Sequence, residues 1–164
     1  MNAVILHKKY FLMILLYSFH FTKAQTPIQI FDFAQYEKRV LQKNDTLYVV
    51  NFWATWCKPC VEELPFFEKT KQTFSQQPVK FILASQDART RSEQVHDFLT
   101  KNNYTAESFI LYAGNPNVWI DKIDTGWSGL IPMTVFYKAG KKVYFHEGDY
   151  TSSEELEKII HSKL

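Results

Sequence analysis

Apolar residues beyond position 25 follow two patterns along the chain: a helical spacing of three to four, and unbroken runs of strand-forming residues. The helical spacing predicts helices over 33–43, from Cys57 to about Phe74, over 90–103, from Asn115 onward and over 151–164. The unbroken runs predict strands over 46–52, 79–85, 108–113, 134–137 and 143–146. Ala139-Gly140, between the last two runs, is typical of a hairpin turn. Strands alternating with helices, followed by a hairpin and a terminal helix, predict a three-layer α/β domain.

The first 24 residues have a different character. Lys8 and Lys9 precede a mostly apolar run over 10–21, and Ala24 stands where a signal peptidase would cut, ahead of Gln25. The run is interrupted by polar residues and is shorter than the roughly 20 apolar residues of a membrane span. We therefore predict a signal peptide over 1–24 and a mature domain over 25–164. An N-terminal membrane anchor is the alternative if the signal is not cleaved.

The charge balance changes once the predicted signal is removed. The whole chain of 164 residues has 19 basic and 17 acidic side chains, for a formal charge of +2. Three of the lysines lie in 1–24, so 25–164 is nearly neutral. A nearly neutral domain argues against a nucleic-acid partner. Export would place the protein in the periplasm or cell envelope, where thiols tend to be oxidised.

The two cysteines, Cys57 and Cys60, lie where a predicted strand leads into a predicted helix. The first N–H groups of a helix and its dipole favour negative charge, so a Cys57 thiolate should be stabilised there, and Lys58 acts in the same direction. Pro59 falls in the first helical turn, where its missing N–H costs little. Cys60, one turn further on, is placed to attack a mixed disulfide formed on Cys57. The spacing predicts a two-step dithiol exchange.

Other roles for the pair remain open at this stage. A structural disulfide would close a very short loop, where chain-entropy stabilisation is smallest. A zinc site would need two further ligands, and 25–164 offers only three histidines and no second cysteine pair. The thiols could instead bind copper, or the redox site could be vestigial. Peroxidase chemistry is disfavoured because Ala54 stands where a peroxidatic cysteine requires threonine.

The segment Asn51-Phe52-Trp53-Ala54-Thr55-Trp56-Cys57-Lys58-Pro59-Cys60, followed by Glu63 and Pro65, closely resembles the TlpA/ResA branch of the thioredoxin-like superfamily. The order of elements over 79–164 and the segment Ile131-Pro132-Met133-Thr134 support the resemblance. It implies a thioredoxin-like fold: a central mixed sheet flanked by helices, with an extra helix inserted after the second core strand. It also implies exported thiol–disulfide oxidoreduction, usually in the reducing direction.

The resemblance also implies roles for individual residues. Cys57 corresponds to the nucleophile and Cys60 to the resolving thiol. Pro132 corresponds to a cis-proline facing the pair, and the backbone of Ile131 is expected to pair with an extended substrate peptide. Trp56 would form an apolar rim beside Cys57, although ordinary packing explains a tryptophan there equally well.

Three residues are expected to tune the redox behaviour: Lys58, Pro59 and Glu63. Glu63 matches an acidic residue of the TlpA/ResA branch and would act on the Cys60 proton or contact substrate, unless it is a solvated helix carboxylate. Thioredoxin itself carries a buried aspartate where this chain has Asn51, so that proton-handling group is missing here.

The resulting prediction is a protein disulfide reductase without cofactor or bound metal, acting as a monomer. Its substrates would be protein disulfides, for example those of an apocytochrome or a copper-site protein. A membrane thiol donor would re-reduce it. The alternatives are a dithiol oxidase working in the opposite direction and a non-enzymatic module that binds copper or another metal.

Overall fold

The computed structural model describes residues 28–164, so the predicted signal peptide over 1–24 lies outside the described residues. Six strands form one mixed sheet: β1 Gln29–Phe31, β2 Leu47–Trp53, β3 Val79–Ser85, β4 Glu107–Leu111, β5 Met133–Lys138 and β6 Lys141–Glu147. The helices are α1 Phe33–Val40, α2 Lys58–Thr73, α3 Ser92–Lys101, α4 Ile120–Ile123 and α5 Ser153–Lys163, with short 3₁₀ turns η1 Arg89–Arg91 and η2 Pro116–Val118. The predicted α/β class is confirmed.

The strand order in the sheet is β1-β4-β3-β2-β5-β6. β2 lies at the centre, runs parallel to β3 and antiparallel to β5, and all seven of its residues are buried. β5 and β6 form the predicted hairpin. Ala139 and Gly140 both have positive φ in its two-residue turn, a conformation that glycine adopts without steric cost.

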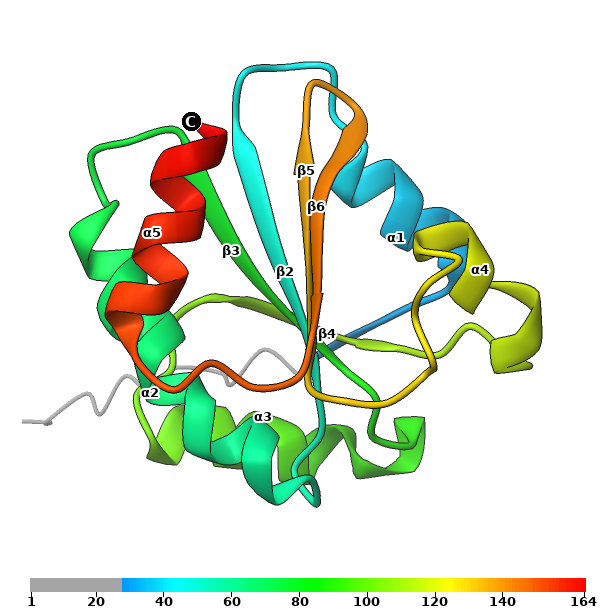
Figure 1. Cartoon of the computed structure of the whole chain (residues 1–164). Helices are drawn as coiled ribbons and strands as arrows, with labels where there is room; N and C mark the ends of the chain where they lie inside the picture. Colours follow the sequence, from blue (N-terminus) through cyan, green and yellow to red (C-terminus); the bar gives the residue numbers. More distant parts are fainter. Residues whose placement is uncertain (1–27) are drawn as a thin grey trace, which may run out of the picture.

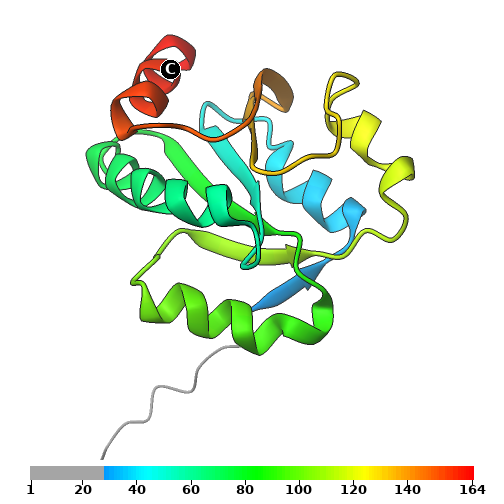
Figure 2. The same ribbon diagram turned by 60° about the horizontal axis from the view of Figure 1, so that its bottom comes forward.

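Helices cover both faces of the sheet, which produces the predicted three layers (Figure 1). α2, α3 and α5 share one apolar cluster, in which Phe67, Leu99 and Leu156 are buried. α1 and α4 pack on the other face through a second cluster that contains Tyr36 and Ile123. In Figure 2, α3 lies beside β4 and β1. This is the helix expected after the 79–85 strand, and it leads into β4.

The predicted first helix, 33–43, was too long. α1 ends at Val40 because the β5–β6 turn packs against the residues that follow it. The Ala139 N–H donates to the Asn44 carbonyl at 3.2 Å, and a Cβ on Gly140 would lie 3.2 Å from Lys43 Cγ. A contact between segments so distant in sequence is invisible to a local pattern.

The helix predicted from Asn115 onward was also only partly right. Asn115 does act as a cap, since its side chain accepts from the Asn117 N–H at 3.1 Å, but it caps the 3₁₀ turn η2. The chain then bends at Trp119, whose φ is −126°, before the short helix α4. The bend buries the Trp119 and Ile123 side chains against the sheet.

The parallel strands β2 and β3 end at the same edge of the sheet. Trp53 is the register partner of Ser85, and the Gln86 N–H donates to the Trp53 carbonyl at 2.7 Å. This register brings the loop after β2, which contains the cysteines, beside the loop after β3. In the described part of the chain, no helix combines the length and hydropathy needed to cross a membrane.

Candidate active site

The two cysteines form a disulfide at the start of α2. β2 delivers the chain to this point, and the Cys57 N–H donates to the Ala54 carbonyl at 3.1 Å, which closes the turn between strand and helix. Cys57 is the N-cap of α2, and its Sγ accepts from the Cys60 N–H at 3.3 Å. α2 therefore begins directly after Cys57, and the sequence predicted a helix start at this position.

This geometry differentiates the two sulfurs. Cys57 retains 6% of its exposure, whereas Cys60 is fully buried behind it. In the reduced protein, a thiolate at the N-cap would accept from the same N–H and lie at the positive end of the helix dipole. A large molecule approaching from solvent would meet Cys57 first, because Cys60 lies inside the protein.

Ile131 and Pro132 lie directly against the cysteine pair, although they are more than seventy positions away in sequence. Their peptide bond is cis, as predicted, and the Ile131 carbonyl oxygen lies 3.7 Å from Cys57 Sγ. The Gly148 N–H donates to the Pro132 carbonyl at 3.0 Å and ties this segment to the end of β6. Pro132 is buried and Ile131 is half-buried. The segment thus forms a wall beside Cys57 Sγ.

Trp56, Lys58 and Pro59 form the exposed rim of the site. Trp56 keeps 64% of its surface exposed, so this side chain is not part of the core. Lys58 Nζ lies 3.5 Å from Glu62 Oε1, and both side chains are well exposed. Such an exposed pair is weak, and Glu62 partly offsets the charge that the sequence pattern assigned to Lys58. Pro59 stands in the first turn of α2, as predicted.

Glu63 is not the solvated carboxylate that the sequence left open as an alternative. It is 1% exposed and lies one turn beyond Cys60 on the inner side of α2. Its Oε1 accepts from the Asn51 amide at 2.7 Å and its Oε2 from the Tyr150 N–H at 2.9 Å. Burial raises the pKa of Glu63 to about 7, even though these two donors act to lower it.

Asn51 stands where thioredoxin carries a buried aspartate, so the sequence predicted that this carboxylate is missing. The structure shows that the Asn51 amide instead donates to a buried carboxylate, that of Glu63. The Asn51 amide nitrogen also lies 3.2 Å from Thr134 Oγ1, and the Asn51 Oδ1 has no hydrogen-bond partner among the described residues. A buried acid is therefore present near the cysteines after all, contributed by α2 rather than by β2.

Asp87 is a site residue that the sequence analysis missed. Its buried carboxylate accepts from the Thr55 N–H at 2.9 Å, from Thr55 Oγ1 at 2.7 Å and from Ser85 Oγ at 2.9 Å. It thus fixes the loop two residues before Cys57. A polar residue just after a strand parallel to β2 was the available signal, because the carboxyl ends of parallel strands gather at one sheet edge.

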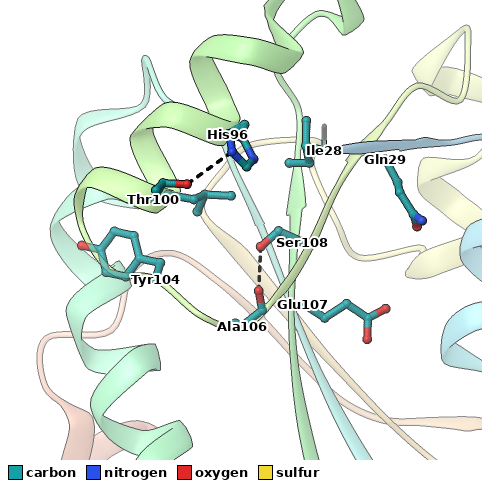
Figure 3. Close-up of a pocket in the computed structure, with 9 residues that line it drawn as sticks. Ile28, Gln29, His96, Thr100, Tyr104, Ala106, Glu107 and Ser108 are labelled. Carbon is teal, nitrogen blue, oxygen red and sulfur yellow. Dashed lines mark hydrogen bonds between the residues drawn. The ribbon is translucent and has the colours of Figure 1, made fainter. Parts of the chain in front are cut away.

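Two cavities differ in their position relative to the cysteine pair. One of about 230 Å³ adjoins the site and is lined by Trp56, Gln86, Pro116, Trp119, Ile120, Trp127, Gly129 and Ile131. The other, of about 370 Å³, lies between α3 and the β1–β4 edge (Figure 3) and contains no predicted site residue. Among residues 28–164, no group of three or more His, Cys, Asp or Glu side chains is arranged to hold a metal ion.

The chain is similar in sequence to known thiol–disulfide oxidoreductases. The family model described as Thioredoxin matches residues 28–103, which include the whole cysteine motif. Residues 28–103 are therefore thioredoxin-like in sequence. Thioredoxin-like protein YneN of Bacillus subtilis is 36% identical over 50 residues, which cover 30% of this chain and 29% of that protein. Thiol-disulfide oxidoreductase ResA of Bacillus thuringiensis is 37% identical over 38 residues, covering 23% and 22%.

A solved structure supports the fold independently. The thiol:disulfide interchange protein of the thioredoxin family from Chlorobium tepidum superposes with a TM-score of 0.59 over 73% of this chain and 81% of that one, at 22% identity. The chain matches less than a third of the length of the curated relatives YneN and ResA.

Proposed function

We propose that this protein is an exported thiol–disulfide oxidoreductase of TlpA/ResA type that reduces disulfides in other proteins. The Cys57 thiolate attacks one sulfur of the substrate disulfide, so that a mixed disulfide forms and one substrate thiolate leaves. The Cys60 thiolate then attacks Cys57 Sγ and releases the second substrate thiolate. The Cys57–Cys60 disulfide remains, and a membrane thiol donor would return two electrons to it.

The observation that carries this proposal is the position of Cys57 as the N-cap of α2. Its sulfur accepts the Cys60 N–H, keeps some exposure and covers the buried partner sulfur. A helix start that stabilises a thiolate serves exchange chemistry and has no evident use in a purely structural bridge. The buried position of Cys60 suits a thiol that attacks only the mixed disulfide.

Glu63 supports the second step of this mechanism. It lies on the same helix as Cys60, one turn away, in a buried environment that raises its pKa to about 7. A carboxyl group that titrates near neutral pH is suited to accept and return a proton. We propose that Glu63 takes up the Cys60 proton when this thiol attacks and supplies it when the dithiol is regenerated.

Export follows from the leader over 1–24, with its lysines, apolar run and Ala24. Mass spectrometry of protein from the native host should find Gln25 as the first residue. Finding an intact Met1 on membrane-bound protein would show that the segment is an uncleaved membrane anchor.

Insulin reduction in the presence of dithiothreitol tests the activity. The unsubstituted protein should accelerate precipitation of the insulin B chain, and Cys57→Ser should not. Cys60→Ser should retain the first step only, so it should accumulate mixed disulfides with substrate proteins in the cell envelope. An inactive protein that instead binds one copper ion through both thiols would make the metal-binding module the correct function.

A further inference from the structure

The cavity of about 230 Å³ beside the cysteines is lined mostly by aromatic and aliphatic side chains, with Gln86 as the one polar side chain among its lining residues. Trp119 and Trp127 form its buried wall, with ring centroids 5.7 Å apart. Trp56 lines it from the cysteine loop, and Ile131 lines it from the segment before β5. Three of the four tryptophans of the chain thus meet around one small hollow.

The cavity shares two lining residues, Trp56 and Ile131, with the immediate surroundings of Cys57. Trp56 is covalently joined to Cys57, and the Ile131 carbonyl lies 3.7 Å from Cys57 Sγ. A polypeptide whose disulfide reaches Cys57 along the Ile131 segment passes the mouth of the cavity. Since an extended chain advances about 3.3 Å per residue, the side chain above the cavity comes from a residue one or two positions from the substrate cysteine.

The rim beside Ile131 is held in place rather than loose. The Trp127 indole N–H donates to the Leu130 carbonyl at 2.7 Å, and the Ser128 N–H donates to Glu147 at 3.0 Å. Gly129 has a φ of +89°, and a Cβ there would lie 3.1 Å from Ile120 Cδ1. A larger residue at position 129 would be strained at this φ and would press against Ile120, which lines the cavity.

The surroundings are apolar as well. Trp56, Val118 and Leu130 expose 64%, 61% and 69% of their surface; Trp56 lines the cavity, and Val118 and Leu130 are chain neighbours of residues that line it. Large exposed apolar residues that cluster around a hollow mark a binding surface. The residues that line the cavity carry no formal charge, so its preference is set by shape and hydrophobicity.

Resting on the proposed function, we propose that this cavity is a specificity subsite for a large apolar side chain, aromatic or branched aliphatic, adjacent to the cysteine of the substrate polypeptide. Burying that side chain between Trp119, Trp127 and Ile120 would orient the substrate disulfide against Cys57. The subsite selects partners by the residue next to their cysteine.

The test compares disulfide-linked dimers of one short peptide in which the residue beside cysteine is Phe, Leu or Ser. The reduced protein should reduce the Phe and Leu dimers with a second-order rate constant about tenfold above that of the Ser dimer. Gln86→Phe and Ile120→Phe, which fill the cavity from different walls, should each remove that preference. Val143→Phe adds the same side chain on the exposed edge strand β6, outside the cavity lining, and should preserve it.

Two further measurements separate the subsite from the activity. Oxidised glutathione has no apolar side chain, so both filling variants should reduce it as fast as the unsubstituted protein. Peptides with cysteine replaced by serine should quench tryptophan fluorescence more strongly when they carry Phe, without any reaction. Equal rate constants and equal quenching for Phe and Ser peptides would overturn the subsite. Failure to reduce any disulfide, with selective quenching intact, would overturn only the proposed reductase activity.

Discussion

The Asn51 amide nitrogen donates to Glu63 Oε1 across 2.7 Å, and both side chains are buried. This contact joins the central strand β2 to the helix that begins at Cys57. Burial raises the pKa of Glu63 to about 7, although the Asn51 amide acts to lower it, and this places a pH-sensitive group one helical turn from Cys60.

Glu63→Gln should flatten the pH dependence of stability. Because the folded-state pKa of Glu63 is raised, the folded protein binds more protons than the unfolded chain between about pH 4.5 and 7. The contribution of Glu63 to the free energy of unfolding is therefore fully present below its pKa in the unfolded chain. This contribution is lost as pH rises to about 7. The glutamine stays neutral, and Asn51 Oδ1, which has no partner among the described residues, accepts from it if the Asn51 amide turns over.

Urea unfolding at pH 4.5 and pH 7.5 measures this effect. The unsubstituted protein should lose about 2 to 3 kcal/mol more than Glu63→Gln over that interval. Glu62→Gln, an exposed neighbour on the same helix, serves as the control and should behave like the unsubstituted protein. Equal losses in all three proteins would show that Glu63 titrates as an ordinary carboxylate.

Cys57 should also stabilise α2 as a helix cap, independently of its redox role. With the disulfide reduced, Cys57→Ala removes the acceptor of the Cys60 N–H, whereas Cys57→Ser replaces it with a hydroxyl oxygen. The alanine variant should be less stable than the serine variant by about 1 kcal/mol in urea unfolding. Both variants lack the nucleophile, so a difference between them cannot come from disulfide chemistry.

Asp87→Ala should loosen the loop before Cys57. The substitution leaves two donors of Thr55 and the Ser85 hydroxyl without their acceptor, so the protein should lose about 2 to 3 kcal/mol of stability. The rate of insulin reduction measured well below the melting temperature should fall as well. Asp97→Ala, on the exposed surface of α3, is the matched control. An Asp87→Ala protein with unchanged stability would remove Asp87 from the site.

The reduction potential decides the proposed direction. A glutathione redox titration of the Cys57–Cys60 pair should yield a value well below the roughly −120 mV of a strong oxidant, because a reductase needs a stable disulfide product. Lys58 favours the thiolate and acts in the oxidising direction, but its exposed pairing with Glu62 limits that effect. A value near −120 mV would make the protein a dithiol oxidase.

Local pattern was sufficient for the elements that build the site. A run of apolar residues ending at Trp53 and helical spacing from Cys57 onward predicted the strand, the helix and the sulfur at its start, since these depend on short-range periodicity and capping. The cis bond before Pro132 was expected only from the resemblance to the TlpA/ResA branch, because no local rule favours it at this position.

The tertiary structure decided which polar side chains serve the site. The sequence pattern of α2 does not distinguish Glu63 from a glutamate on the surface of the helix. Only the packing of α2 against β2 and against the segment before α5 removes Glu63 from water. Asp87 reaches Thr55 through the parallel register of β2 and β3, and the tryptophan-lined cavity forms where loops from three parts of the chain meet. The sequence by itself determined the strand, the helix start and the place of the cysteine pair between them, because those features are local. Burial and cross-strand contacts required the folded chain, because their partners are distant in sequence.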